Sequence, residues 1–213
     1  MEVEFVGHPL MDIIDSHPIN LTFKKENNLS DQPIIALLPG SRKQEIKRML
    51  HKMLEIAEHF PNYQFVIAGA PAIDRSFYEQ IIQDIKNGQP GLQCTLVENK
   101  TYDLLQHASA ALVTSGTATL ETALFGVPQV VCYSGNKWSY LLAKRLINVK
   151  YIALVNLIVD RPLLTELIQD ELNPENLCSE LNKLFDPEQR AIIEAGYSEL
   201  RTLLGQAGAS QRV

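Results

Sequence analysis

A predicted strand-to-helix turn at residues 114–117 carries the residue types that bind phosphate. The apolar run 110–113 leads into Thr114-Ser115-Gly116-Thr117, and a helical pattern follows. We predict that Ser115 caps this helix and that Gly116 lets the backbone turn and a ligand approach closely. The N–H groups of the first turn and the positive end of the helix dipole then form an anion site.

The same helix carries a hydroxyl and a carboxylate on one face. Thr117 and Glu121 are four residues apart, which places them about 6 Å from one another. This spacing suits a hydroxyl near a phosphate and a carboxylate near the adjoining ribose. An ordinary capped helix with a solvated glutamate explains these residues equally well, so the local sequence leaves both interpretations open.

A second turn with similar chemistry lies at Pro39-Gly40-Ser41-Arg42, directly after the apolar run 34–38. We predict Ser41 as a helix N-cap and include Gly40 and Ser41 in the site. Arg42 adds a planar positive fork that suits phosphate, and without an anion it would oppose the positive end of the helix dipole. A solvated first-turn arginine is the alternative. Neither turn matches the GxGxxG or GxxxxGK[ST] fingerprint of dinucleotide or nucleoside triphosphate sites.

The elements that position these turns form a regular alternation of apolar runs and helical patterns. Strands are predicted over residues 34–38, 63–68, 92–97, 110–114, 129–133 and 151–154. Continuous apolar runs are typical of strands buried on both faces of a parallel sheet. The alternation predicts an α/β, Rossmann-like, doubly wound parallel sheet of about six strands. The first and fourth strands flank the topological switch point, so both turns open on one crevice.

Helices are predicted between the strands and after the last one. Their approximate ranges are 42–59, 74–86, 101–107, 116–125, 174–185 and 187–204, with a further helix after Lys137. Gly126 suits a left-handed helix end, and a proline starts each of the last two helices. We interpret residues 1–33 as a linker and lead-in segment and residues 34–213 as the nucleotide-binding domain. The abrupt start suggests a piece of a longer protein.

Two further features have both a functional and a structural interpretation. Asn156 follows the sixth predicted strand, where its amide can point into the crevice or simply support a turn. An aromatic and basic cluster comprises Lys137, Trp138, Tyr140, Lys144 and Arg145. This cluster suits an anionic lipid surface, but a helix with an apolar face and solvated charges explains it as well.

Composition excludes several classes of protein. The 213 residues carry a formal net charge of -6, which argues against a broad nucleic-acid surface. No apolar run approaches the roughly 18–20 residues of a membrane span, and the N-terminus does not resemble a signal peptide. Cys94, Cys132 and Cys178 are widely spaced, which favours reduced thiols in a cytosolic protein. The histidines show no metal-ligand spacing, so we expect neither a metal nor a cofactor.

Catalytic residue sets are also missing. No nucleophile elbow is present, and no Ser–His–Asp or Cys–His set can be assembled. A diphosphate site without a visible base suggests half of an enzyme. Fixed electrostatics from the helix start and Arg42 can stabilise a leaving nucleoside diphosphate, while the base and the acceptor come from elsewhere.

Several ordered segments resemble the lipid-A-disaccharide synthase family. The segments are residues 5–12, 37–46, 115–121, 142–146, 155–158 and 166–171, and together they span most of the chain. The resemblance implies one half of a two-domain GT-B glycosyltransferase. Such an enzyme transfers 2,3-diacylglucosamine from UDP to 2,3-diacylglucosamine 1-phosphate with inversion, and releases UDP. The resemblance also implies that the protein is peripheral, lies on the cytoplasmic face of the Gram-negative inner membrane and needs no metal.

The resemblance also assigns residues to the donor nucleotide. Arg42, Ser115, Gly116, Thr117, Glu121 and Asn156 fall where the family contacts its UDP-sugar. Glu121 matches the acidic residue on the ribose. The proposed acid/base residue and the acceptor site belong to the N-terminal domain, which this chain lacks, so the piece alone is expected to be inactive. Residues 208–212 resemble the start of the family's last helix. The surface left exposed by the missing domain leads to a separate expectation, a homodimer that pairs or swaps its C-terminal helices.

Two alternatives stay open. A UDP-N-acetylglucosamine 2-epimerase-like enzyme would share the fold and the anion-binding helix. A non-catalytic nucleotide-binding module would keep the domain without the chemistry.

Overall fold

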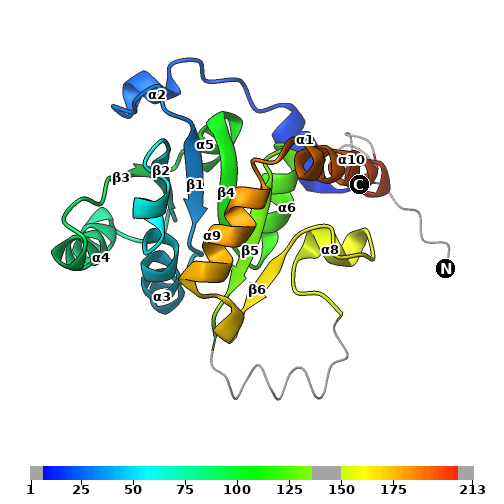
Figure 1. The fold of residues 1–213 in the computed structure, drawn as a ribbon. Helices are drawn as coiled ribbons and strands as arrows, with labels where there is room; N and C mark the ends of the chain where they lie inside the picture. Colours follow the sequence, from blue (N-terminus) through cyan, green and yellow to red (C-terminus); the bar gives the residue numbers. More distant parts are fainter. Residues whose placement is uncertain (1–6, 136–149, 206–213) are drawn as a thin grey trace.

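A six-stranded parallel sheet organises the chain in the computed structural model, which describes residues 7–135 and 150–205 (Figure 1). Its strands are β1 Ile34–Leu38, β2 Gln64–Gly69, β3 Cys94–Glu98, β4 Ala108–Thr114, β5 Gln129–Tyr133 and β6 Glu166–Ile168. Their order is β3-β2-β1-β4-β5-β6, and every neighbouring pair is parallel. The direction of winding changes between β1 and β4. The doubly wound sheet and its central switch point are therefore confirmed.

Helices connect and cover the strands. They are α1 Pro9–Asp15, α2 Phe23–Glu26, α3 Lys43–Leu54, α4 Arg75–Gly88, α5 Thr101–His107, α6 Thr117–Leu124, α8 Leu154–Ile158, α9 Pro174–Lys183 and α10 Pro187–Leu204. Short 3₁₀ turns lie at Ala57–His59 and Gln169–Glu171. Asn173 and Asp186 cap α9 and α10 with their side chains, each followed by proline. The predicted helix and cluster over residues 137–147 lie outside the described residues.

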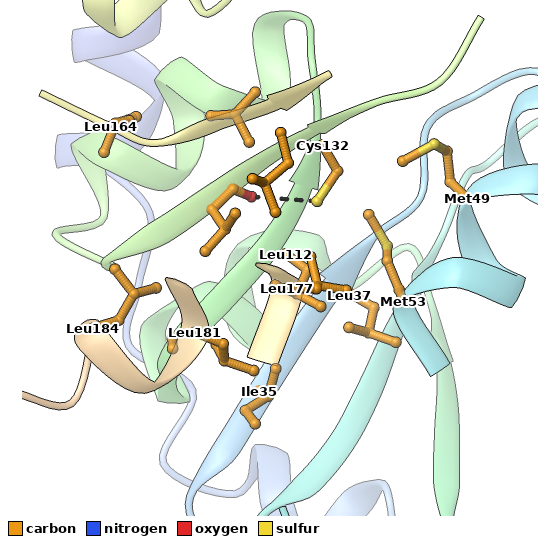
Figure 2. Close-up of a cluster of buried hydrophobic side chains, with 14 of the residues drawn as sticks. Ile35, Leu37, Met49, Met53, Leu112, Cys132, Leu164, Leu177, Leu181 and Leu184 are labelled. Carbon is orange, nitrogen blue, oxygen red and sulfur yellow. Dashed lines mark hydrogen bonds between the residues drawn. The ribbon is translucent and has the colours of Figure 1, made fainter. Parts of the chain in front are cut away.

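The core lies on both faces of the sheet because every residue of β1 is buried. On one face, α3 and α9 lie over the central strands (Figure 2). The side chains that belong to this cluster include Ile35, Leu37, Met49, Met53, Leu112, Leu177 and Leu181. The alternate residues Ile34, Ala36 and Leu38 belong to a second cluster with Leu104 and Leu105 of α5. The parallel pairing of β1 with β4, in which Leu38 lies opposite Val113, places the carboxyl ends of the two strands side by side.

The predicted sixth strand at residues 151–154 is wrong. This segment leads into α8, and the strand that pairs with β5 is β6. The backbone N–H groups of Ile152 and Ala153 each donate to the carboxylate of Glu166 at 3.0 Å. These donors therefore bind a side chain of β6 instead of joining the sheet.

The lead-in segment packs onto the sheet domain. Met11 and Ile14 of α1 and Phe23 of α2 are buried. The N–H of His8 donates to the carbonyl of Leu204 at 3.1 Å, which holds α1 beside α10 (Figure 1). Across residues 7–135 and 150–205, no helix has both the length and the apolar character for crossing a membrane.

Candidate functional site

A cavity of about 310 Å³ opens at the carboxyl ends of β1, β2 and β4. This edge of a doubly wound sheet is where ligands bind, and the volume lies at the small end of ligand pockets. Six of the predicted site residues line it: Gly40, Ser41, Ser115, Gly116, Thr117 and Glu121. The two turns on either side of the switch point thus face one space.

The start of α6 forms one wall of this cavity. Gly116 is the N-cap, and its φ of 150° and ψ of -164° lie in a region that is essentially restricted to glycine. Ser115 does not cap the helix as predicted, because its Oγ donates to the carbonyl of Ile152 at 2.9 Å. Among the described residues no side chain caps α6. The N–H of Thr119 donates to the carbonyl of Gly116 at 3.1 Å, so the N–H groups of Thr117 and Ala118 are the ones left for an anion or water within the described residues.

Thr114 adds an unpaired hydroxyl to the same wall. Its side chain lines the cavity, although the residue is only 4% exposed. Its Oγ1 has no hydrogen-bond partner within the described part of the chain. A buried hydroxyl without a partner is unfavourable, so a ligand atom at this position would stabilise it. The sequence places Thr114 in the predicted phosphate-binding turn, but its spacing does not single out its hydroxyl as a ligand.

Glu121 faces the cavity from α6 and is held by a residue that the sequence pattern does not identify. The hydroxyl of Tyr102 donates to Oε1 of Glu121 at 2.9 Å. Burial, followed by the negative charge of Glu121 and this hydrogen bond, raises the pKa of Tyr102 to about 12. The hydroxyl therefore stays protonated near neutral pH and remains a donor.

The turn after β1 forms the opposite wall. Gly40 has a φ of 104°, and a Cβ there would overlap the carboxylate of Glu45. Ser41 is not the N-cap of α3, because that position is taken by Arg42. The backbone N–H of Ser41 donates to Oε2 of Glu45 at 3.2 Å. The carboxylate of Glu45 thus lies against this turn. The spacing of residues 41 and 45 allows this contact, but it is not enough to predict it from the sequence.

Arg42 lines a neighbouring cavity of about 450 Å³. Lys43, Arg48 and Tyr133 also line this second space, and Glu45 borders both cavities. A guanidinium N–H of Arg48 donates to the carbonyl of Ser134 at 2.8 Å. The structure therefore places Arg42 in a neighbouring cavity that shares the lining residue Glu45 with the cavity at the start of α6.

Asn156 lies elsewhere, which corrects the prediction that its amide points into the crevice. The residue is fully buried in α8. Its Nδ2 donates to the carbonyl of Leu164 at 2.9 Å and to Oε1 of Glu166 at 2.8 Å. Its Oδ1 accepts from the N–H of Leu164 at 2.8 Å. These internal bonds orient the amide toward β6 and the segment before it.

In the described ranges, no cysteine lines either of the two cavities. Cys94, Cys132 and Cys178 are free thiols. Within the part of the chain that the structure describes, no group of three or more His, Cys, Asp or Glu side chains could hold a metal ion.

Comparison with known proteins identifies relatives of this chain. A sequence profile described as lipid-A-disaccharide synthetase matches residues 1–212. The lipid-A-disaccharide synthase of Syntrophus aciditrophicus (strain SB) is 38% identical over 218 aligned positions, which cover 100% of this chain and 56% of the relative. The chain therefore spans little more than half the length of that relative.

Solved structures show the same fold at low sequence identity. A UDP-N-acetylglucosamine 2-epimerase matches with a TM-score of 0.57 and 14% identity, covering 97% of this chain and 48% of the other. Anabaena Alr3699/HepE in complex with UDP and glucose matches with a TM-score of 0.59 and 13% identity. The match covers 90% of this chain and 49% of the HepE chain. This likeness identifies the sheet and its helices as the Rossmann-like half of a GT-B fold. Because the family profile spans nearly every residue, the chain belongs to the lipid-A-disaccharide synthetase family.

Proposed function

We propose that this chain is the donor-nucleotide half of lipid-A-disaccharide synthase and binds UDP-diacylglucosamine in the cavity at α6. The observation that carries the proposal is the uncapped start of α6 at Gly116, which opens on a cavity that also holds Glu121. Family membership supports a glycosyltransferase of lipid A biosynthesis. The UDP complex of HepE, which has the same fold, supports a nucleotide-sugar ligand.

In this proposal the walls of the cavity hold different parts of the nucleotide. The diphosphate binds the N–H groups at the start of α6 and the hydroxyls of Thr114 and Thr117. The ribose hydroxyls bind Glu121. Arg42 approaches the diphosphate from the adjoining cavity. These fixed donors and the guanidinium stabilise the charge that develops on UDP as the glycosidic bond breaks, without a metal ion.

The complete reaction needs more than this half. The enzyme would transfer the diacylglucosamine unit, with inversion, to 2,3-diacylglucosamine 1-phosphate and release UDP. The acceptor site and the base that takes the proton of the acceptor hydroxyl would come from the N-terminal half of the family's longer chains. We expect this chain alone to bind nucleotide without catalysis. We expect the whole enzyme to work at the cytoplasmic face of the inner membrane, and a homodimer is compatible with this arrangement.

Calorimetric titration of the chain with UDP and with ADP tests the proposal. We expect UDP to bind with measurable heat and ADP to bind at least about tenfold more weakly, a difference of about 1.4 kcal/mol. Absence of UDP binding, or equal binding of the two nucleotides, would argue against a UDP-sugar site.

Replacement of Arg42 by alanine should weaken UDP binding by about 1.5–3 kcal/mol, because a charge-assisted hydrogen bond to the diphosphate is lost. The same titration measures the loss. Arg190→Ala is the matched control, since Arg190 pairs with Glu194 on the exposed face of α10. An unchanged UDP affinity in Arg42→Ala would remove Arg42 from the proposed site.

An epimerase-like reaction is the second candidate, favoured by the fold shared with a UDP-N-acetylglucosamine 2-epimerase. Product analysis of the full-length enzyme with acylated and non-acylated donors separates the two reactions. A disaccharide formed only from the acylated donor supports the synthase, while isomerisation of the free UDP-sugar supports the epimerase. A non-catalytic nucleotide-binding module would give neither product while still binding nucleotide.

A further inference from the structure

We propose that Tyr102 is a positioning residue that orients the carboxylate of Glu121 for the ribose hydroxyls and so gives the site its preference for a ribonucleotide. The inference rests on the proposed function, because it assumes that a uridine nucleotide occupies the cavity at α6. Tyr102 does not line that cavity itself, and it acts through its hydrogen bond to Oε1 of Glu121.

The hydrogen bond leaves most of the carboxylate available. A carboxylate can accept about four hydrogen bonds, and Tyr102 uses one of them. No other hydrogen bond to this carboxylate is found among residues 7–135 and 150–205. The remaining acceptor positions suit two vicinal hydroxyl donors, which is the arrangement that a ribose presents.

Packing fixes the position of the Tyr102 ring. His17 meets it edge-on, with ring centroids 5.4 Å apart and an interplanar angle of 88°. Phe125, which directly follows α6, packs against the same ring at a tilt of 47°, with ring centroids 5.1 Å apart. His17 is held in turn by a 2.8 Å contact between its Nε2 and Oδ1 of Asp103. The hydroxyl is therefore preorganised by α5, the lead-in segment and the end of α6.

Charge explains why Glu121 needs such a partner. The carboxylate lies one helical turn beyond the proposed diphosphate position at Thr117. Two negative groups at this separation repel one another, and the repulsion grows as the carboxylate turns toward the phosphates. A donor on the other side of the carboxylate favours the rotamer that keeps Glu121 over the ribose. Tyr102 is the residue that supplies this donor.

The test compares UDP with 2′,3′-dideoxy-UDP, which lacks both ribose hydroxyls. The chain of 213 residues and its Tyr102→Phe variant are titrated with both nucleotides. We expect the wild-type chain to prefer UDP. In Tyr102→Phe we expect the UDP affinity to fall about tenfold while the affinity for dideoxy-UDP changes by less than about twofold. In a Glu121→Ala background, Tyr102→Phe should have no further effect on UDP.

Tyr197→Phe is the matched control. Its hydroxyl is buried, donates to the carbonyl of Val127 at 3.0 Å and lies 3.2 Å from Nε2 of Gln129, away from the cavity. We expect this variant to melt at a lower temperature with an unchanged ratio of the two affinities.

The possible outcomes separate this inference from the proposed function. If the wild-type chain binds UDP and Tyr102→Phe keeps the wild-type ratio, or weakens both nucleotides equally, the positioning role is overturned and the UDP site stands. A further loss of UDP affinity in the Glu121→Ala background also overturns it. If the wild-type chain binds neither nucleotide, the proposed function and this inference fail together.

Discussion

Replacement of Asn156 by alanine is expected to lower the free energy of unfolding by about 3 kcal/mol. The amide makes three hydrogen bonds in the interior, two of them to the backbone of Leu164 and one to Glu166. Alanine would leave the N–H and C=O of Leu164 without these partners, and each unsatisfied buried group costs about 1–3 kcal/mol. Urea unfolding followed by far-ultraviolet circular dichroism measures the change.

Asn87→Ala provides the control for this prediction. Asn87 is exposed on α4 and accepts a bond from Gln83 at 3.1 Å. Its replacement should change stability by no more than about 0.5 kcal/mol. If Asn156→Ala were as stable as Asn87→Ala yet failed to bind UDP, Asn156 would contact the nucleotide, and the interpretation drawn from its position in the sequence would be restored.

Replacement of Gly116 by alanine should weaken UDP binding at least about tenfold and destabilise the fold by about 1–3 kcal/mol. A Cβ at this position meets no other atom within 4 Å, so the cost comes from the backbone conformation and not from a steric clash. An alanine relaxes toward permitted angles, and this change turns the first N–H groups of α6 away from the cavity. Calorimetry with UDP and thermal melting measure the two effects.

Gly126→Ala separates strain from binding. Gly126 follows the other end of α6, has a φ of 74° and also has open space where the methyl group of an alanine would lie. Its replacement should cost about 1 kcal/mol of stability because the left-handed conformation disfavours alanine. Its UDP affinity should equal that of the wild type. Equal losses of UDP binding in both variants would mean that Gly116 acts only through stability.

The arrangement of the sheet follows from local patterns in the sequence. Five strands are predictable from their apolar runs. These runs are continuous where a strand is buried on both faces, as at residues 34–38, whereas in the edge strand β3 only Leu96 and Val97 are buried. β6 has only three residues and pairs with β5 alone, so it leaves a weak pattern. The longer apolar run at residues 151–154 has the pattern of a strand and is therefore predicted as the sixth strand instead of β6. That run packs beside Glu166, a contact between distant residues that periodicity does not encode.

In the site, too, features set by neighbouring residues in the sequence are predictable, whereas contacts between distant residues are not. The cavity-lining turns are predictable because glycine and small hydroxyl residues follow buried strands at Gly40 and Gly116. The partners of the side chains are not predictable. Ser115 bonds to Ile152 instead of capping α6, and Tyr102 of α5 reaches Glu121 of α6. Each contact depends on packing between separate elements of the chain.

The contact between Glu45 and Ser41 means that a carboxylate of the chain itself already occupies one N–H donor at the edge of the proposed phosphate site. The carboxylate rests on a backbone N–H at the start of α3, so an incoming anion must compete with it. A short tether corresponds to an effective concentration in the millimolar range or above. Singly charged anions at ordinary concentrations therefore gain little by displacing Glu45, whereas a diphosphate that also engages α6 can replace it. In the proposed complex, the loop would therefore favour highly charged ligands, because a ligand must displace Glu45 in order to bind there.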